Sequence, residues 1–399
     1  MTRHDDSRVG RLGLLARLAV DDTRRALRDH ARPRPLQRRE DAIDAGVRWL
    51  CLTHDVTRRQ GSSRGYSLVR GWAAPFPETT GYIIGTLLVC AERRKDSALV
   101  ERAEQMGDWE IEIQCEDGGV IEGLLTKTPK RSTIFNTGMV MHGWLDLHER
   151  SSRDDYLEAA VRGGEFLRRG QDADGAWRGE VEYFRIPHTY CARVSWALLR
   201  LAQATGDDSY RKTATRQLDW VLQMQNPAGW FESCAFKPGK FPNTHGIAYT
   251  LRGLLESHAL IGRDQYLEAA IRTSDALIPK LDAHRALLPA SYDAAWRPRA
   301  RYECLTGTAQ LGGVWLRLFE LTGERRFLVA GTTAVERAAA HQVCDPGSTN
   351  TDGALPGSYP IYGRYAPLAF PNWATKFLID SLLLHERNSA ARPTALSIS

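Results

Sequence analysis

Stretches with helical periodicity alternate along the chain between two hydrophobic patterns. In the first pattern, apolar and small residues occupy most of the helix circumference, which is typical of a helix buried on nearly all sides. Six segments share this pattern: 79–92, 135–150, 189–205, 245–261, 307–322 and 373–387. In the second pattern, apolar residues keep to one face, as at 155–169 and 209–225, which predicts amphipathic helices with one side in solvent.

The two patterns alternate because the sequence repeats itself. The segment Tyr-Leu-Glu-Ala-Ala that starts at Tyr156 recurs at Tyr266, and weaker copies start at Ala98, Tyr210 and Phe327. Successive copies are 58, 54, 56 and 61 residues apart, which fits a repeat of two helices. Each copy opens an amphipathic helix directly after a polar turn, so each repeat pairs one buried helix with one amphipathic helix.

The ends of the repeat predict a closed ring. An amphipathic helix at 40–54 has no buried partner before it, and the buried helix at 373–387 has no amphipathic partner after it. If these two pack together, six buried helices line a barrel and six amphipathic helices shield it. We therefore predict an all-α fold, an (α/α)6 toroid over residues 37–390 with six inner and six outer helices. An open helical solenoid is the alternative with the same period.

The charges are unevenly distributed. Residues 1–40 contain 11 Arg and six acidic residues and so account for the whole formal net charge of +5. The remaining residues hold 42 basic and 42 acidic side chains. We interpret residues 1–36 as a short basic N-terminal arm and 391–399 as a C-terminal tail. The arm either touches an acidic partner or membrane surface or is a loosely ordered solubilising tail. The neutral body argues against nucleic-acid binding, which needs a surplus of cations.

Composition argues against further classes of protein. Mean hydropathy is −0.38, and no apolar stretch has the ~18 residues of a transmembrane helix, so an integral membrane protein is not expected. Seven cysteines occur singly, without CxxC spacing, which together with the lack of a clear signal peptide predicts a cytoplasmic protein. No His, Asp and Glu cluster has ligand spacing, so we expect neither a metal nor a cofactor.

The long connections of such a ring all lie at the end where the inner helices begin. They span 55–78, 115–134, 171–188, 226–244, 281–305 and 343–371. Candidate catalytic groups at this end are those that exchange protons: Glu78, His188, Tyr190, His245 and Glu303. Candidate substrate-binding groups are amides, cations and aromatic rings: Trp72, Tyr82, Asn136, Trp177, Arg193, Trp230, Tyr249, Tyr359, Asn372 and Lys376.

Some of these groups also have a purely structural interpretation. The connections share a Gln-x-x-x-Gly device at Gln171, at Gln225 and, more weakly, at Gln114. Its glycine is typical of a helix stop, and the Trp that follows at 177 or 230 either packs over the helix end or stacks on a sugar ring. The same choice applies to Trp72 and Tyr359.

The candidate residue types suit chemistry on an acidic sugar. An Asn or His that neutralises a uronate carboxylate makes the C5 proton more acidic, and a Tyr or His then removes that proton or protonates the leaving oxygen. The product is an unsaturated sugar (a lyase) or an inverted uronate (an epimerase). Glycoside hydrolysis instead needs two opposed carboxylates about 5–10 Å apart, for which Glu78 and Glu303 are one pair, with Asp172, Asp174, Glu180 and Asp352 as rivals.

Two segments resemble a known family. Pro-Glu-Thr-Thr-Gly-Tyr at 77–82, within the run 65–84, and Asn-Trp-Ala-Thr-Lys-Phe at 372–377 resemble bacterial polysaccharide-biosynthesis proteins of the VpsJ type, a squalene-cyclase-like α/α-toroid family. The resemblance covers about residues 40–388 and implies the toroid and a glycan context. It transfers no catalytic residues, so the roles above are assigned by residue type.

Three functional hypotheses follow. The first is a carbohydrate-active enzyme that acts on an acidic oligo- or polysaccharide by proton abstraction or by hydrolysis. The second is a non-catalytic glycan-binding or scaffold protein of an exopolysaccharide pathway. The third is an isoprenoid cyclase, which is disfavoured because the Asp-x-Asp-Asp motif of the protonating cyclases has no match, the nearest strings being 172–175 and 207–209.

Overall fold

The computed structural model describes residues 38–125, 131–281, 288–345 and 347–390, together with Gly13, Ala16 and Arg17. Apart from those three residues, the predicted basic arm at 1–36 lies outside the described residues, as does the predicted tail at 391–399.

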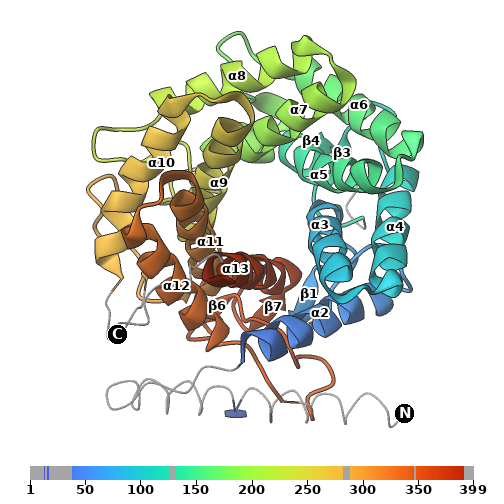
Figure 1. The fold of residues 1–399 in the computed structure, drawn as a ribbon, viewed down its shortest axis with the longest axis vertical. Helices are drawn as coiled ribbons and strands as arrows, with labels where there is room; N and C mark the ends of the chain where they lie inside the picture. The colour runs from blue at the N-terminus through green and yellow to red at the C-terminus, as the bar shows by residue number, and fades with distance from the viewer. Residues whose placement is uncertain are drawn as a thin grey trace, which may run out of the picture.

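Two concentric rings of helices make up the structure (Figure 1). The inner ring consists of α3 (Pro77–Arg94), α5 (Ile134–Ser151), α7 (Ala192–Thr205), α9 (Thr244–Ile261), α11 (Leu305–Thr322) and α13 (Asn372–Ala390). The outer ring consists of α2 (Arg39–Asp55), α4 (Ser97–Glu112), α6 (Asp154–Arg169), α8 (Asp208–Gln223), α10 (Asp264–Leu277) and α12 (Arg325–Ala339). The ring closes where α13 packs against both α2 and α3, which confirms the predicted (α/α)6 toroid.

In the three copies of the repeat that begin with tyrosine, this tyrosine joins successive outer helices. Tyr156 on α6 donates a hydrogen bond from Oη to Asp108 on α4, at 2.8 Å. Tyr210 on α8 donates to Glu165 on α6 at 3.0 Å, and the Tyr266 hydroxyl of α10 is bonded by Arg263, which also pairs with an acid on α8. A related polar contact therefore recurs at three successive junctions of the outer ring, from α4 to α10.

The glycine of the Gln-x-x-x-Gly motif lets the long connection pack closely against the next outer helix. Gly118 has a φ of +86°, and a Cβ there would lie 2.4 Å from the carbonyl oxygen of Arg162 on α6. Gly175 makes the same close approach, at 2.4 Å, to Arg216 on α8. Only glycine combines the left-handed backbone with so little space, so both glycines have a structural role. They lie six residues beyond the last helical residue, Glu112 or Arg169, and not at the helix stop that was expected.

Short strands in the long connections add a feature that the periodicity does not predict. They are β1 (Gly65–Ser67), β2 (Gly71–Trp72), β3 (Val120–Ile121), β4 (Ser132–Thr133), β5 (Glu303–Cys304), β6 (Ser358–Tyr359) and β7 (Ala369–Pro371). The sheets have the order β2-β1-β7, β3-β4 and β5-β6, all antiparallel. Pairing of Gly65 with Pro371 joins the first connection to the last. Strands of two or three residues are too short to have an alternating pattern.

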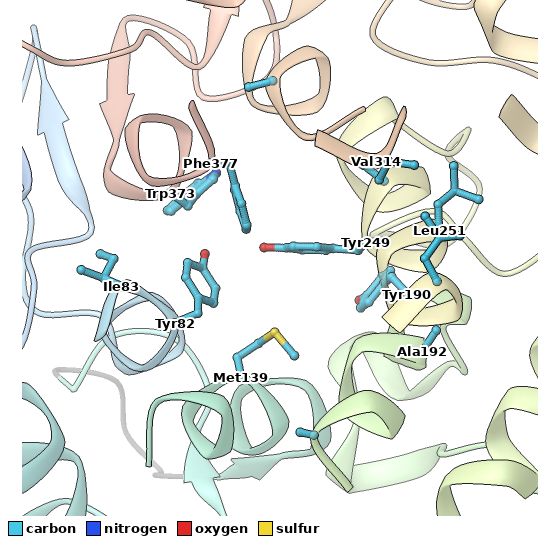
Figure 2. Packing of buried hydrophobic residues seen from close by; sticks show 14 of the residues in the cluster. Tyr82, Ile83, Met139, Tyr190, Ala192, Tyr249, Leu251, Val314, Trp373 and Phe377 are labelled. Carbon is cyan, nitrogen blue, oxygen red and sulfur yellow. The ribbon is translucent and has the colours of Figure 1, made fainter. Parts of the chain in front are cut away.

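Three aromatic rings meet on the barrel axis and divide its interior. Tyr82 from α3, Tyr249 from α9 and Phe377 from α13 point toward one another (Figure 2). The ring centroid of Phe377 lies 5.4 Å from that of Tyr82 and 5.7 Å from that of Tyr249. We call these three rings the aromatic floor, since one cavity lies on each side of them. None of the helices in the described part of the chain combines the length and apolar character required to span a bilayer.

Candidate active site

The upper cavity lies at the end of the barrel where the inner helices begin, and its volume is about 260 Å³. Nine of its twelve lining residues are aromatic, which makes it largely apolar. The other three carry charge or exchange protons. The lining consists of Arg64, Phe76, Glu78, Phe135, Tyr183, Phe184, Tyr190, Phe236, His245, Tyr249, Tyr365 and Trp373. The cavity therefore contains four of the predicted residues, namely Glu78, Tyr190, His245 and Tyr249.

Glu78 is the one carboxylate among the lining residues described. It occupies the first turn of α3, directly after Pro77, and is half-buried. Burial raises the pKa of its carboxyl to about 7, although the charges of Arg64 and Arg193 act in the opposite direction. Desolvation disfavours the charged form of a carboxyl group. Glu78 is therefore protonated in about half of the molecules near neutral pH, which suits a general acid.

His245 enters the cavity from the first turn of α9. Its Nδ1 donates a hydrogen bond to Oε1 of Gln310 on α11, so the proton of the neutral ring is on Nδ1 and Nε2 is unprotonated. Burial lowers the pKa of His245 to about 3. The helices that carry His245 and Glu78, α9 and α3, lie opposite each other in the inner ring (Figure 1), and both side chains line the cavity.

Arg64 stands at the rim of the cavity and is exposed. Its guanidinium lies 5.0 Å from the ring of Trp373 and 5.7 Å from the ring of Phe76, which holds the cation by contacts with the ring faces. Its backbone is also fixed, because its N–H donates to Ala74 and its carbonyl accepts from Asn372. A fixed, accessible guanidinium is suited to binding a carboxylate through two parallel hydrogen bonds.

Two further predicted residues lie behind the lining. His188 is buried and stacks on Tyr190, with ring centroids 4.4 Å apart, and its Nε2 donates to the carbonyl of Tyr183 at 3.0 Å. Asn136 is fully buried and accepts a hydrogen bond from the Tyr183 hydroxyl at 2.9 Å. Both side chains orient aromatic residues that face the cavity, and neither is part of the cavity lining.

Three predicted residues lie at or below the aromatic floor. Tyr82 belongs to the floor itself. Arg193 and Lys376 line a second, smaller cavity on its far side. The guanidinium of Arg193 lies 5.0 Å from the ring of Tyr249, and Lys376 forms an ion pair with Asp380.

The remaining predicted residues are engaged elsewhere. Glu303 is fully buried, accepts a hydrogen bond from Thr308, and has a pKa raised to about 7 by burial. Asn372 is fully buried and donates from Nδ2 to Ser63 at 2.8 Å. Because neither lines the upper cavity, Glu78 and Glu303 do not share it.

The four rings considered as sugar-stacking platforms, Trp72, Trp177, Trp230 and Tyr359, make contacts within the protein. The indole N–H of Trp177 donates to Leu167 at the end of α6, at 2.9 Å. Trp72 donates to Asn350 at 3.0 Å, and Trp230 donates to the carbonyl of Tyr292 at 3.2 Å. Tyr359 packs its ring on His341, with centroids 4.2 Å apart. None of these four rings lines the upper cavity among the residues described.

Sequence reasoning missed most of the lining. Arg64, Tyr183, Phe184, Phe236 and Tyr365 lie in the long connections, where helical periodicity gives no information about direction. The missed residues near helix starts are Phe76, Phe135 and Trp373. A sequence signal for them was available, because each lies within two residues of a predicted site residue.

Comparisons with known proteins agree with this architecture. Residues 131–260, less than half of the chain, match the family model described as squalene-hopene cyclase C-terminal domain. No curated protein sequence matches the chain. The chain is an α/α toroid.

Solved structures share the fold over most of the chain. An unsaturated glucuronyl hydrolase from Bacillus sp. GL1 is 16% identical, has a TM-score of 0.69, and covers 88% of this chain and 97% of its own. A D-mannose isomerase is 13% identical, with a TM-score of 0.69 and coverage of 86% and 97%. A cellobiose 2-epimerase from Bacillus thermoamylovorans is 9% identical, with a TM-score of 0.67 and coverage of 86% and 98%. Similarity at these identities shows the fold and assigns no residue a role.

Proposed function

We propose that the protein is a carbohydrate-processing enzyme that transfers protons on a small acidic sugar, with Glu78 as the acid and His245 as the base. The observation that carries this proposal is the pairing of the two groups across one cavity in complementary protonation states. The pKa of Glu78 is raised to about 7, whereas that of His245 is lowered to about 3. Environments that separate two pKa values in this way are typical of acid and base partners.

Arg64 supports an acidic substrate. A uronate carboxylate bound to its guanidinium would have its charge neutralised, and the C5 proton beside that carboxylate would become more acidic. The aromatic lining offers flat surfaces for the C–H faces of a pyranose ring. The volume of about 260 Å³ lies just below the roughly 300–1,000 Å³ of ordinary ligand pockets, which favours one or two sugar units in the cavity.

The proposed chemistry begins with removal of the C5 proton by Nε2 of His245. Glu78 then donates its proton either to the leaving glycosidic oxygen, which gives an unsaturated uronate, or to the opposite face of C5, which gives the epimer. Hydrolysis by two carboxylates has less support, because Glu78 is the one carboxylate of the described lining and Glu303 lies outside it.

One comparison and the sequence resemblance supply context for the proposal. The structural neighbours include proteins named as a sugar isomerase and a sugar epimerase, and those names denote rearrangements of sugars. The resemblance to VpsJ-type proteins adds polysaccharide biosynthesis as the setting.

The test is incubation with a panel of uronate-containing oligosaccharides in D2O, followed by mass spectrometry and ultraviolet absorbance. Elimination gives a double bond conjugated to the carboxylate, and epimerisation introduces one deuterium at C5 without cleavage. Glu78→Gln and His245→Gln should each lower kcat/KM by about 10²–10⁴-fold. Loss of activity in Glu303→Gln with retained activity in Glu78→Gln would contradict the proposal.

Other outcomes of the same panel identify the competing functions. Reducing ends without a double bond or deuterium would indicate hydrolysis. Saturable binding of a glycan with no product would indicate the scaffold hypothesis. A polyprenyl diphosphate included in the panel tests the cyclase hypothesis, which the aromatic lining and the family match at 131–260 both bring forward.

A further inference from the structure

A second cavity lies on the barrel axis beyond the aromatic floor, and we call it the lower chamber. Its volume is about 70 Å³. Most of its lining comes from positions further along the inner helices than the lining of the upper cavity. These residues include Arg193 and Trp196 on α7, Arg252 on α9, and Lys376, Asp380 and Ser381 on α13. Trp196, Arg252 and Asp380 are half-exposed, so solvent reaches the chamber. A space of this size excludes a sugar but admits a small ion.

Two of the three cations in the chamber have a carboxylate partner. Lys376 pairs with Asp380, which also accepts a hydrogen bond from Thr86 at 2.6 Å. Arg252 pairs with Glu256, with 2.8 Å between its Nε and the carboxylate oxygen. Their charges are therefore compensated locally.

Arg193 has no such partner. Its side chain belongs to a residue only 5% exposed, and within the described part of the chain no carboxylate forms an ion pair with it. Its Nε has no hydrogen-bond partner there. The guanidinium is in contact with ring faces, at 5.0 Å from Tyr249, 5.6 Å from Trp196 and 5.7 Å from Phe377. Aromatic contacts compensate a buried cation only in part, and an uncompensated buried charge is strongly unfavourable.

A neutral donor stands beside this cation. Gln310 lines the lower chamber, while its Oε1 accepts the proton of His245 from the upper cavity. Because the oxygen of the amide is engaged by His245, the amide nitrogen remains as its hydrogen-bond donor. The chamber thus combines an unpaired guanidinium, an amide group and paired cations, which is the chemistry that binds an anion.

We propose that the lower chamber binds one small monovalent inorganic anion, for which chloride is the probe, against Arg193. One such anion compensates the one unpaired charge and fits the available volume. The site is separated from the upper cavity by the aromatic floor, so this proposal does not depend on the proposed enzymatic activity.

The test is the melting temperature, Tm, of the whole protein as chloride replaces gluconate at constant ionic strength and pH. Gluconate is too large for the chamber. A ligand that binds the folded state raises stability with the logarithm of its concentration above Kd, so we expect Tm to rise by several degrees over a hundredfold range of chloride. Lys212→Met, which removes an exposed cation on α8, should keep the full response.

Two variants remove the site in different ways. Arg193→Met removes the charge, and Ala248→Leu fills the chamber, which Ala248 lines, while keeping the charge. In each, Tm should no longer depend on chloride. If Arg193→Met does not fold, two measurements still test chloride binding. They are the chloride dependence of Tm in Ala248→Leu and the line width of 35Cl in nuclear magnetic resonance of the wild type. A wild-type Tm independent of chloride, or an unchanged response in both variants, would overturn the proposal.

Discussion

The ionisation of Glu78 determines the pH range in which the proposed acid carries its proton. The pKa of this carboxyl is raised to about 7, chiefly by burial. Each pH unit above that value lowers the protonated fraction tenfold, so at two units above it about 1% of the acid remains. His245 stays neutral throughout this range because its pKa is about 3. We therefore expect kcat/KM to be constant from pH 5 to 6 and to fall tenfold per unit above pH 7.

Arg64 allows the assignment of that pH dependence to Glu78. Its charge lowers the pKa of Glu78, so Arg64→Gln should move the fall in kcat/KM to higher pH. The same substitution should raise KM for an acidic sugar, because the substrate carboxylate loses its partner. Arg70→Gln, which removes another exposed arginine from the same connection, is the matched control and should change neither property.

The measurement is kcat/KM between pH 5 and 10 for the wild type and both arginine variants, since this ratio reports the pKa values of the free enzyme. Glu78→Gln should retain a small residual rate with no fall above pH 7. The assignment of Glu78 as the acid would be refuted if kcat/KM of Arg64→Gln fell at the same pH as that of the wild type. It would also be refuted if kcat/KM of Glu78→Gln fell above pH 7 by as much as that of the wild type.

Three further predictions concern stability. Burial raises the pKa of Glu182 from 4.5 to about 8, so the stability contributed by its protonated carboxyl is complete below pH 4.5 and is lost as pH rises through 8. In urea unfolding, Glu182→Gln should remove a pH dependence on the order of 5 kcal/mol. Gly118→Ala should lower the free energy of unfolding by more than ~2 kcal/mol, because the added Cβ would collide with the carbonyl oxygen of Arg162. Gly206→Ala is the control: its φ is +75° but the space beside it is open, so this variant should lower the free energy of unfolding by only ~1 kcal/mol. Trp144→Ala should cost ~3–5 kcal/mol in chemical unfolding, because this side chain on α5 is fully buried; a cost below 1 kcal/mol would contradict its place in the core.

Helical periodicity was sufficient to predict the toroid. An inner helix is covered on nearly all sides by its neighbours, so apolar and small residues occupy most of its circumference. The expected segment at 79–92 differs from α3 (Pro77–Arg94) by two residues at each end. The number of helices then predicts the (α/α)6 arrangement, because the unpaired outer helix at the start of the repeat can pack against the unpaired inner helix at its end.

The site was harder to predict because its residues depend on contacts between distant segments. Arg64 reaches the rim only because β1 pairs with β7, about 300 residues later in the chain. Glu303 illustrates the opposite error. It does precede an inner helix, as expected, but β5 pairs with β6 and its carboxylate accepts from Thr308 within the protein. A sequence predicts which residues lie at the start of a helix, but it does not predict the direction of a side chain in a long connection.

The aromatic floor explains why one barrel can hold two arginines with different tasks. Arg64 is exposed above the floor and Arg193 is buried below it, with the ring of Tyr249 5.0 Å from the Arg193 guanidinium. A carboxylate bound by Arg64 cannot reach Arg193 while Tyr82, Tyr249 and Phe377 meet on the axis. Both cations nevertheless lower the pKa of Glu78, because electrostatic effects in a poorly hydrated interior extend beyond contact distance. An anion beside Arg193 would therefore raise the pKa of Glu78 and move the fall in kcat/KM to higher pH. An anion beside Arg64 would raise the pKa of Glu78 only until the substrate displaced that anion.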